Sequence, residues 1–209
     1  MAGIEFVYDG GDARLETAIG HATSLLRSTH FRSIIENRPT PFFNTTRSCT
    51  EIARAIFECD AQIRITMFSK KPRFGTLTTG YADPNVADTI FFNTYALDRS
   101  VAANINTLVH EAVHIVDKFH DRVGGFDFTH KGNKPFKPPQ NQDSAPYWIG
   151  NRCVDLLPLL QDSTKSAFGL ASLDDLAIED VTAALTETNW AGEEGSTCGT
   201  HAEEEEEEE

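Results

Sequence analysis

The first third of the chain alternates apolar and polar residues with a helical period. Apolar residues recur three and four positions apart over residues 12–36, which predicts one long amphipathic helix that ends before Pro39. Ser48 and Glu51 have the spacing of a capping box, in which each side chain bonds the backbone N–H of the other residue. This pair predicts a second helix that runs to about Cys59.

In the middle of the chain the period changes to two. Apolar and polar residues alternate over residues 62–68, which predicts a strand. Residues 89–93 form a second short run rich in β-branched and aromatic side chains, and they also predict a strand. Between the two, residues 70–85 are rich in Gly, Pro and Thr, which indicates turns and a hairpin.

Helical periodicity returns in the second half of the chain. Ser100 is placed to cap a long helix, and Gly124 and Gly125 supply its stop signal. A polar, proline-rich stretch over residues 126–142 follows, and connections of this length are usually functional or disordered.

Two more helices are predicted after this stretch. One covers residues 144–157 and would be closed or kinked by Pro158, and the other covers residues 172–190. Helices that precede and follow a few strands are typical of the α+β class, with the strands gathered on one side.

The composition allows one folded domain and argues against acidic partners. The chain has 209 residues, 40% of them hydrophobic, and a formal net charge of -14. Such a surface does not favour nucleic acids or anionic membranes, which need concentrated Lys and Arg. Seven of the negative charges form the terminal run over residues 203–209, which we interpret, with residues 191–202, as an acidic tail or tag outside the fold.

Cysteine usage and the N-terminal sequence say little about location. Cys49, Cys59, Cys153 and Cys198 contain no CxxC pair, and ten residues of helix would hold the first two about 15 Å apart, so we expect four reduced thiols. The N-terminus shows no Sec signal and no span of transmembrane length, which fits a cytoplasmic protein or one exported by another route.

The chemically informative motif is His110-Glu111-Ala-Val-His114, which lies inside the predicted long helix. Residues four apart lie on one helical face, so two imidazoles can bind one metal ion there. Glu111 stands beside them and can act on a water bound to that metal.

On residues 106–114 the chain resembles the zincin metallopeptidases, and the strands that precede them could form the small sheet that zincins place over the active helix. The resemblance covers about residues 60–160 and implies a catalytic Zn²⁺ on His110 and His114. It also implies peptide or protein substrates, which a zinc-bound water would attack with Glu111 as general base. We therefore expect one catalytic domain over residues 1–190, with a small mixed or antiparallel sheet. The alternatives are an inactive zincin-like binding domain and a plain α+β scaffold without metal.

The third metal ligand stays open on the sequence alone. His130 is favoured because imidazole is a preferred zinc donor, and Asp143 is an alternative. His120 has the spacing of a metzincin ligand, and a resemblance to the aspzincins, which use an Asp after the helix, would favour Asp121. A continuous helix, however, would carry both about 9–10 Å beyond His114.

Three further groups are candidates for the site. Asp117 is one turn beyond His114 and is either a partner that orients a ligand or a solvated carboxylate. Tyr147 is a candidate for stabilising an oxyanion, or packs in the core together with Trp148. Residues 62–68 and 88–93 are candidates for edge strands along which an extended peptide substrate could pair.

Overall fold

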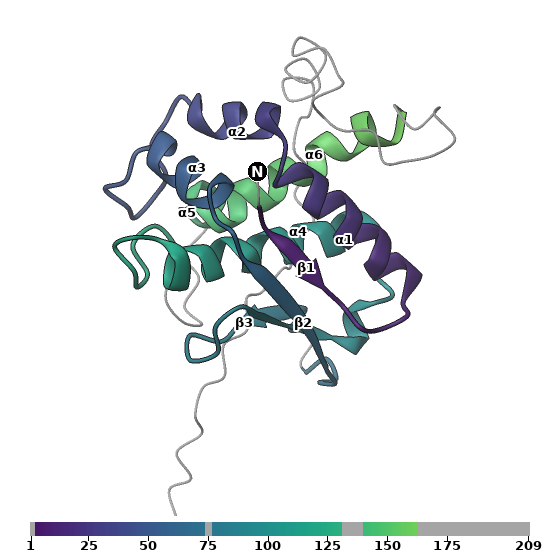
Figure 1. The fold of residues 1–209 in the computed structure, drawn as a ribbon. Coiled ribbons are helices and arrows are strands. Elements are labelled where there is room, and N and C mark those ends of the chain that lie inside the picture. The colour runs from purple at the N-terminus through teal and green to yellow at the C-terminus, as the bar shows by residue number, and fades with distance from the viewer. Residues whose placement is uncertain (1–2, 74–76, 131–139, 163–209) are drawn as a thin grey trace, which may run out of the picture.

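The computed structural model describes residues 3–73, 77–130 and 140–162, and Figure 1 shows their arrangement. The predicted helix over residues 172–190 and the acidic tail lie outside the described residues. The elements follow one another in this order: β1 (Glu5–Val7), α1 (Ala13–Leu25), α2 (Thr29–Glu36), α3 (Cys49–Phe57), β2 (Gln62–Phe68), β3 (Gly80–Ala82), β4 (Thr89–Asn93), the 3₁₀ turn η1 (Thr94–Ala96), α4 (Val101–Ile115), the π-helical turn η2 (Val116–His120), α5 (Gln140–Asp143) and α6 (Ala145–Asp162).

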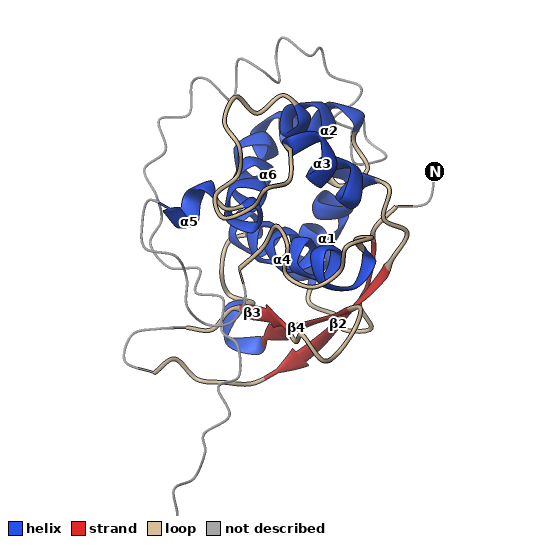
Figure 2. Ribbon diagram, turned by 90° about the vertical axis from the view of Figure 1, so that its left-hand side faces the viewer, coloured by secondary structure: helices blue, strands red, loops and turns tan. Residues whose placement is uncertain are grey.

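The sheet is mixed and has the strand order β1-β2-β4-β3. Strands β1, β2 and β4 are parallel, and β3 pairs with β4 in antiparallel register, so that Tyr81 lies opposite Phe91. Figure 2 shows the large helices gathered over one face of this sheet. The predicted α+β class, with a mixed sheet, is confirmed.

The edges of the sheet are not those expected from the sequence. Strands β2 and β4, which contain residues 62–68 and 89–93, lie in the interior, while β1 and β3 form the edges. The prediction of edge strands at residues 62–68 and 88–93 is therefore wrong. The reason is that β1 and β3 are only three residues long and are too short to show a clear alternating pattern.

The core lies between the sheet and the helices, with α4 at its centre. Alternate residues of β2 and β4 point toward the helices, and α4 packs against α1, α6 and β3. Almost every residue of α4 from Asn104 onward is buried. The side chains that fill this layer with no exposed surface include Ile63, Ile90, Phe92, Ile105, Leu108, Val109 and Ala112.

Two helix boundaries differ from the sequence prediction. The expected helix over residues 12–36 is divided into α1 and α2, because the Ser28 side chain accepts the N–H of Phe31 and starts a new helix there. The long helix also ends earlier than Gly124. It widens into η2 after Ile115 and stops at Asp121, whose backbone is extended.

The C-terminal helix of the described residues runs further than expected. Helix α6 continues past Pro158 to Asp162, so Pro158 does not close it. Within the described ranges, no helix has the length and apolar character needed to cross a bilayer. Cys49, Cys59 and Cys153 are free thiols, as expected for these three.

Candidate metal centre

Helix α4 places two imidazoles side by side in the interior. His110 and His114 are one turn apart, with 2% and 5% of their surfaces exposed, and their Nε2 atoms lie 3.3 Å apart. Burial lowers the pKa of both imidazoles well below the ordinary value of 6.5, because a charged ring would lose its hydration. The two rings are therefore held in the neutral form that binds metals.

A third imidazole reaches the same point from beyond the helix. His130, which ends the described segment after η2, is 3% exposed, and its Nε2 atom lies 3.1 Å from Nε2 of His114. One ligand nitrogen from each of His110, His114 and His130 can be chosen such that all three lie within 4.8 Å of one another. The structure thus brings His130, the favoured third ligand, to the two histidines of the helix.

The spacing of these nitrogens fits a tetrahedral metal ion. Zinc–imidazole bonds of about 2.0–2.1 Å place neighbouring ligand nitrogens about 3.3 Å apart. The two Nε2 separations of 3.1 and 3.3 Å are close to that value. Three neutral imidazoles in one place also suit zinc as a donor set. The residues present therefore fit a zinc ion.

Glu111 lies beside this cluster and is held by the sheet. The residue is 2% exposed, and its Oε2 accepts the backbone N–H of Ala82 in β3 at 2.9 Å. The edge strand β3 runs close along α4, where the side chain of Thr107 leaves room only for a glycine at position 80. The hydrogen bond from Ala82 holds the carboxylate of Glu111 in one orientation. Glu111 is on the same helix as His110 and His114.

Tyr147, near the start of α6, packs against two of the three imidazoles. Its ring meets the His110 ring edge-on with centroids 4.5 Å apart, and it stacks on His130 at 5.7 Å. Trp148 has a different environment, because its ring packs edge-on against Phe42 and lies under the guanidinium of Arg38. Of the two aromatics singled out in the sequence, Tyr147 is therefore at the cluster and Trp148 is not.

The alternative ligands are engaged elsewhere. His120 pairs with Asp88 in the loop between β3 and β4. Asp121 forms an ion pair with Arg47, and Asp143 forms one with Arg38 at 2.8 Å. His120 lies at the end of η2, and the helix therefore carries it past the three imidazoles, while Asp121 just beyond it is bonded to Arg47.

Asp117 is not a solvated helix carboxylate. It has no exposed surface, and it accepts backbone N–H groups of the loop that leads to His130. Burial raises the pKa of Asp117, while these hydrogen bonds act in the opposite direction. Sequence reasoning did not find the partners of this network, which are Arg47, Asp127 and Thr129, because they are distant along the chain and belong to no motif.

Comparison with known proteins finds no match to this chain among family models, curated proteins or solved structures.

Proposed function

We propose that the chain is a zinc-dependent hydrolase that cleaves peptide bonds with Glu111 as general base. The observation that carries this proposal is the convergence of three buried imidazole nitrogens, from His110, His114 and His130, beside a buried carboxylate. Three protein ligands leave the fourth tetrahedral position open, which is the arrangement of catalytic rather than structural zinc.

The roles of the side chains follow from their positions. Zinc, when bound, supplies a Lewis acid that polarises a carbonyl group and makes water more acidic. The Glu111 carboxylate takes a proton from the attacking water and then delivers it to the nitrogen of the leaving amine. The N–H of Ala82 holds Oε2 of Glu111 and so keeps the base in one orientation. To Tyr147, whose ring packs on His110 and His130, we assign the hydroxyl hydrogen bond to the developing oxyanion.

The position of β3 at the edge of the sheet supports a peptide as the substrate. The carbonyl of Thr79 accepts the N–H of Asn93, so Thr79 and Tyr81 direct their backbone groups toward β4. By the alternation of a strand, the backbone groups of Gly80 and Ala82 point away from β4, on the side where Glu111 meets the strand. The N–H of Ala82 is already bonded to Glu111, so an extended peptide would pair through its main chain with the remaining outward groups of this edge, next to the proposed base.

The test is the substitution Glu111→Gln, with Glu51→Gln as its matched control. Glu51 belongs to the capping box of α3 and is exposed, so the control repeats the chemical change outside the site. We expect Glu111→Gln to keep one equivalent of zinc while cleavage of a mixed peptide library falls about 10²- to 10⁴-fold, the usual contribution of a general base. Glu51→Gln should cleave as the unchanged protein does.

Two results would count against this function. Undiminished cleavage by Glu111→Gln would remove the base from the mechanism. Zinc bound at one equivalent without cleavage of any peptide would favour the alternative, a zincin-like domain that binds a partner without catalysis.

A further inference from the structure

The path that brings His130 back to α4 is short and irregular. The chain leaves η2 at Asp121 and turns through Gly124 and Gly125, whose φ angles of 70° and 85° favour glycine. Nine residues after Asp121, the imidazole of His130 arrives beside His114. No helix or strand holds this segment, so its shape depends on other contacts.

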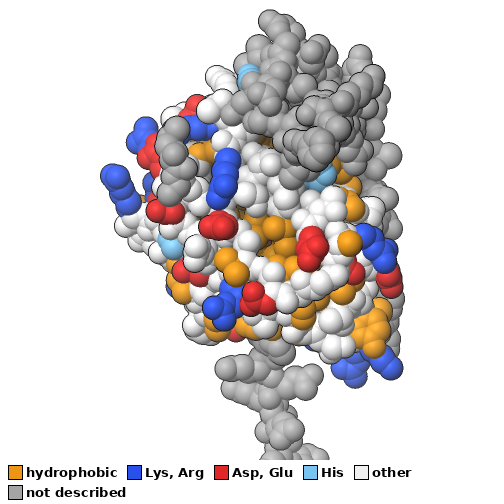
Figure 3. Space-filling model, turned by 45° about the vertical axis from the view of Figure 1, so that its right-hand side comes forward, with side chains coloured by type: hydrophobic (Ala, Val, Ile, Leu, Met, Phe, Trp, Pro, Cys, Tyr) orange, Lys and Arg blue, Asp and Glu red, His pale blue; other side chains and the backbone are white. Residues whose placement is uncertain are grey.

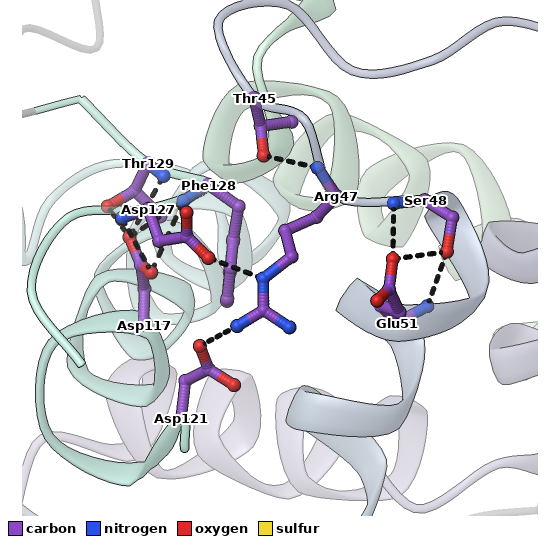
Figure 4. Close-up of polar contacts among 9 residues, drawn as sticks. All are labelled: Thr45, Arg47, Ser48, Glu51, Asp117, Asp121, Asp127, Phe128 and Thr129. Atoms are coloured by element: carbon purple, nitrogen blue, oxygen red, sulfur yellow. Dashed lines mark hydrogen bonds and ion pairs between the residues drawn. The ribbon is translucent and has the colours of Figure 1, made fainter. Parts of the chain in front are cut away.

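Asp117 provides the first set of contacts. Its carboxylate accepts the N–H groups of Asp127 at 3.1 Å, Phe128 at 3.3 Å and Thr129 at 2.9 Å, and also the Thr129 hydroxyl. Figure 4 shows these bonds gathered on one side chain. Asp117 lies in η2, which continues directly from α4, three residues after His114. It therefore links the last residues before His130 to the end of the helix that carries His110 and His114.

Arg47 provides the second set from a different part of the fold. It lies between α2 and α3, and its guanidinium donates to Asp121 through Nη2 and to Asp127 through Nε. These partners stand near the two ends of the segment, as Figure 4 shows. The Arg47 backbone is itself anchored, because its N–H donates to the Thr45 hydroxyl at 3.0 Å and the next residue, Ser48, is the N-cap of α3.

We propose that Asp117 and Arg47 are positioning residues that preset the segment from Asp121 to His130, and that they set zinc affinity through His130. This inference rests on the proposed function of His130 as a metal ligand. Without the contacts of Asp117 and Arg47, the segment that carries the His130 imidazole would have to become ordered as the metal binds. The loss of residues that orient a metal ligand typically weakens metal binding about 10- to 100-fold.

The segment from Asp121 to His130 is also held by an apolar side chain, so the polar contacts can be removed without detaching it from the fold. The side chain of Phe128 is 1% exposed and belongs to the hydrophobic core, so it keeps the segment attached when a polar contact is removed. The chain offers a matched control residue for Arg47 and one for Asp117. Arg32 also bridges two carboxylates, Glu36 and Glu58, and Asp155 is another buried helix carboxylate.

The experiment is a double-mutant cycle on the full chain with zinc itself as the probe. Zinc affinity is measured by competition with a chromophoric chelator for the unchanged protein, Asp117→Asn, His130→Ala and the double variant, and for Arg47→Gln. The visible spectrum of the Co²⁺-loaded forms reports the number of nitrogen ligands, which a merely structural role would not change. Arg32→Gln and Asp155→Asn are treated in parallel.

We expect Asp117→Asn and Arg47→Gln each to weaken zinc binding about 10- to 100-fold and to shift the Co²⁺ spectrum toward that of His130→Ala. In the His130→Ala background, Asp117→Asn should change the affinity less than about twofold, because its route to the metal is gone. The two controls should bind zinc as the unchanged protein does.

Each other result overturns the inference in a distinguishable way. Equal losses from Asp117→Asn with and without His130 would show that Asp117 acts on the whole site and not through His130. Wild-type affinity in both Asp117→Asn and Arg47→Gln would remove their positioning role and leave the proposed hydrolase standing. If Asp117→Asn does not fold, the same cycle is run with Arg47→Gln, alone and combined with His130→Ala, and is judged by the same criteria. An unchanged protein that binds no zinc would overturn the proposed function as well.

Discussion

The sheet approaches helix α4 closely at Gly80, and this contact gives a sharp prediction. A Cβ atom built on Gly80 would lie 2.9 Å from Cγ2 of Thr107 and 3.2 Å from the carbonyl oxygen of Phe91. Carbon atoms at contact are about 3.5–4.0 Å apart, so Gly80→Ala must push β3 away from α4. The N–H of Ala82, two residues further on, holds Glu111 and would move with the strand.

The magnitude follows from two opposing effects. Overpacking a buried contact costs about 1–3 kcal/mol of the free energy of unfolding. Replacing glycine by alanine also lowers the conformational entropy of the unfolded chain, which raises the free energy of unfolding by about 0.4–1 kcal/mol. The midpoints of these two ranges leave a net destabilisation of about 1.3 kcal/mol for Gly80→Ala, with about 2.6 kcal/mol as the upper limit. For a chain of this size each kcal/mol corresponds to about 2–4 °C in Tm.

Thr107→Ser is the partner substitution, because it removes the clashing methyl and keeps the hydroxyl that donates to the Ala103 carbonyl. Alone it should cost about 0.5–1.5 kcal/mol, as other deletions of a buried methyl group do. Combined with Gly80→Ala it should cost little or should restore stability. The assays are thermal unfolding in the presence of a chelator and peptide cleavage with zinc. Additive losses in the double variant, or a Gly80→Ala protein as stable and active as the original, would refute the close approach.

Three further predictions concern other groups. Tyr147→Phe keeps the ring contacts with His110 and His130, so we expect zinc affinity to be retained while kcat falls about 10²- to 10³-fold, and an unchanged kcat would exclude the oxyanion role. Burial lowers the pKa of His21, His110 and His114. Below about pH 6.5 the unfolded chain therefore binds protons that the folded, metal-free protein does not bind. The stability of the metal-free protein, measured in urea, should consequently fall as the pH falls from 7 toward 5. His21→Gln should flatten that slope by up to about 1.4 kcal/mol per pH unit, and an identical slope would contradict the assignment. Burial raises the pKa of Cys59 to about 12, so in a Cys198→Ser background its alkylation by iodoacetamide should await unfolding, and rapid labelling of Cys59 in the folded protein would count against its burial.

Local patterns in the sequence predicted the elements that depend on local physics. The capping box at Ser48 and Glu51 forms as expected, and its side chains exchange the two predicted bonds. The strands at β2 and β4 and the helix that carries His110 and His114 also lie where period and capping place them. These features depend on residues only a few positions apart, so they can be predicted from a single sequence.

The remaining features depend on contacts between distant segments. The edge position of β3 could not be predicted, because three residues carry no clear period and the strand order is set by crossover connections. The convergence of His130 on the two helical histidines depends on Arg47, which is separated from Asp127 by 80 residues, and on the carboxylate of Asp117. Donor chemistry favoured His130 over Asp143, but only the path of the chain shows which side chain arrives.

The central claim, that three imidazoles hold one metal ion beside Glu111, is tested most directly by zinc X-ray absorption spectroscopy of the protein loaded with one equivalent of zinc. The account predicts three imidazole nitrogens and one oxygen donor, with zinc–nitrogen distances of about 2.0–2.1 Å, and the loss of one imidazole contribution in His130→Ala. Two or fewer imidazoles in the unchanged protein, or a spectrum that His130→Ala leaves as it was, would contradict it.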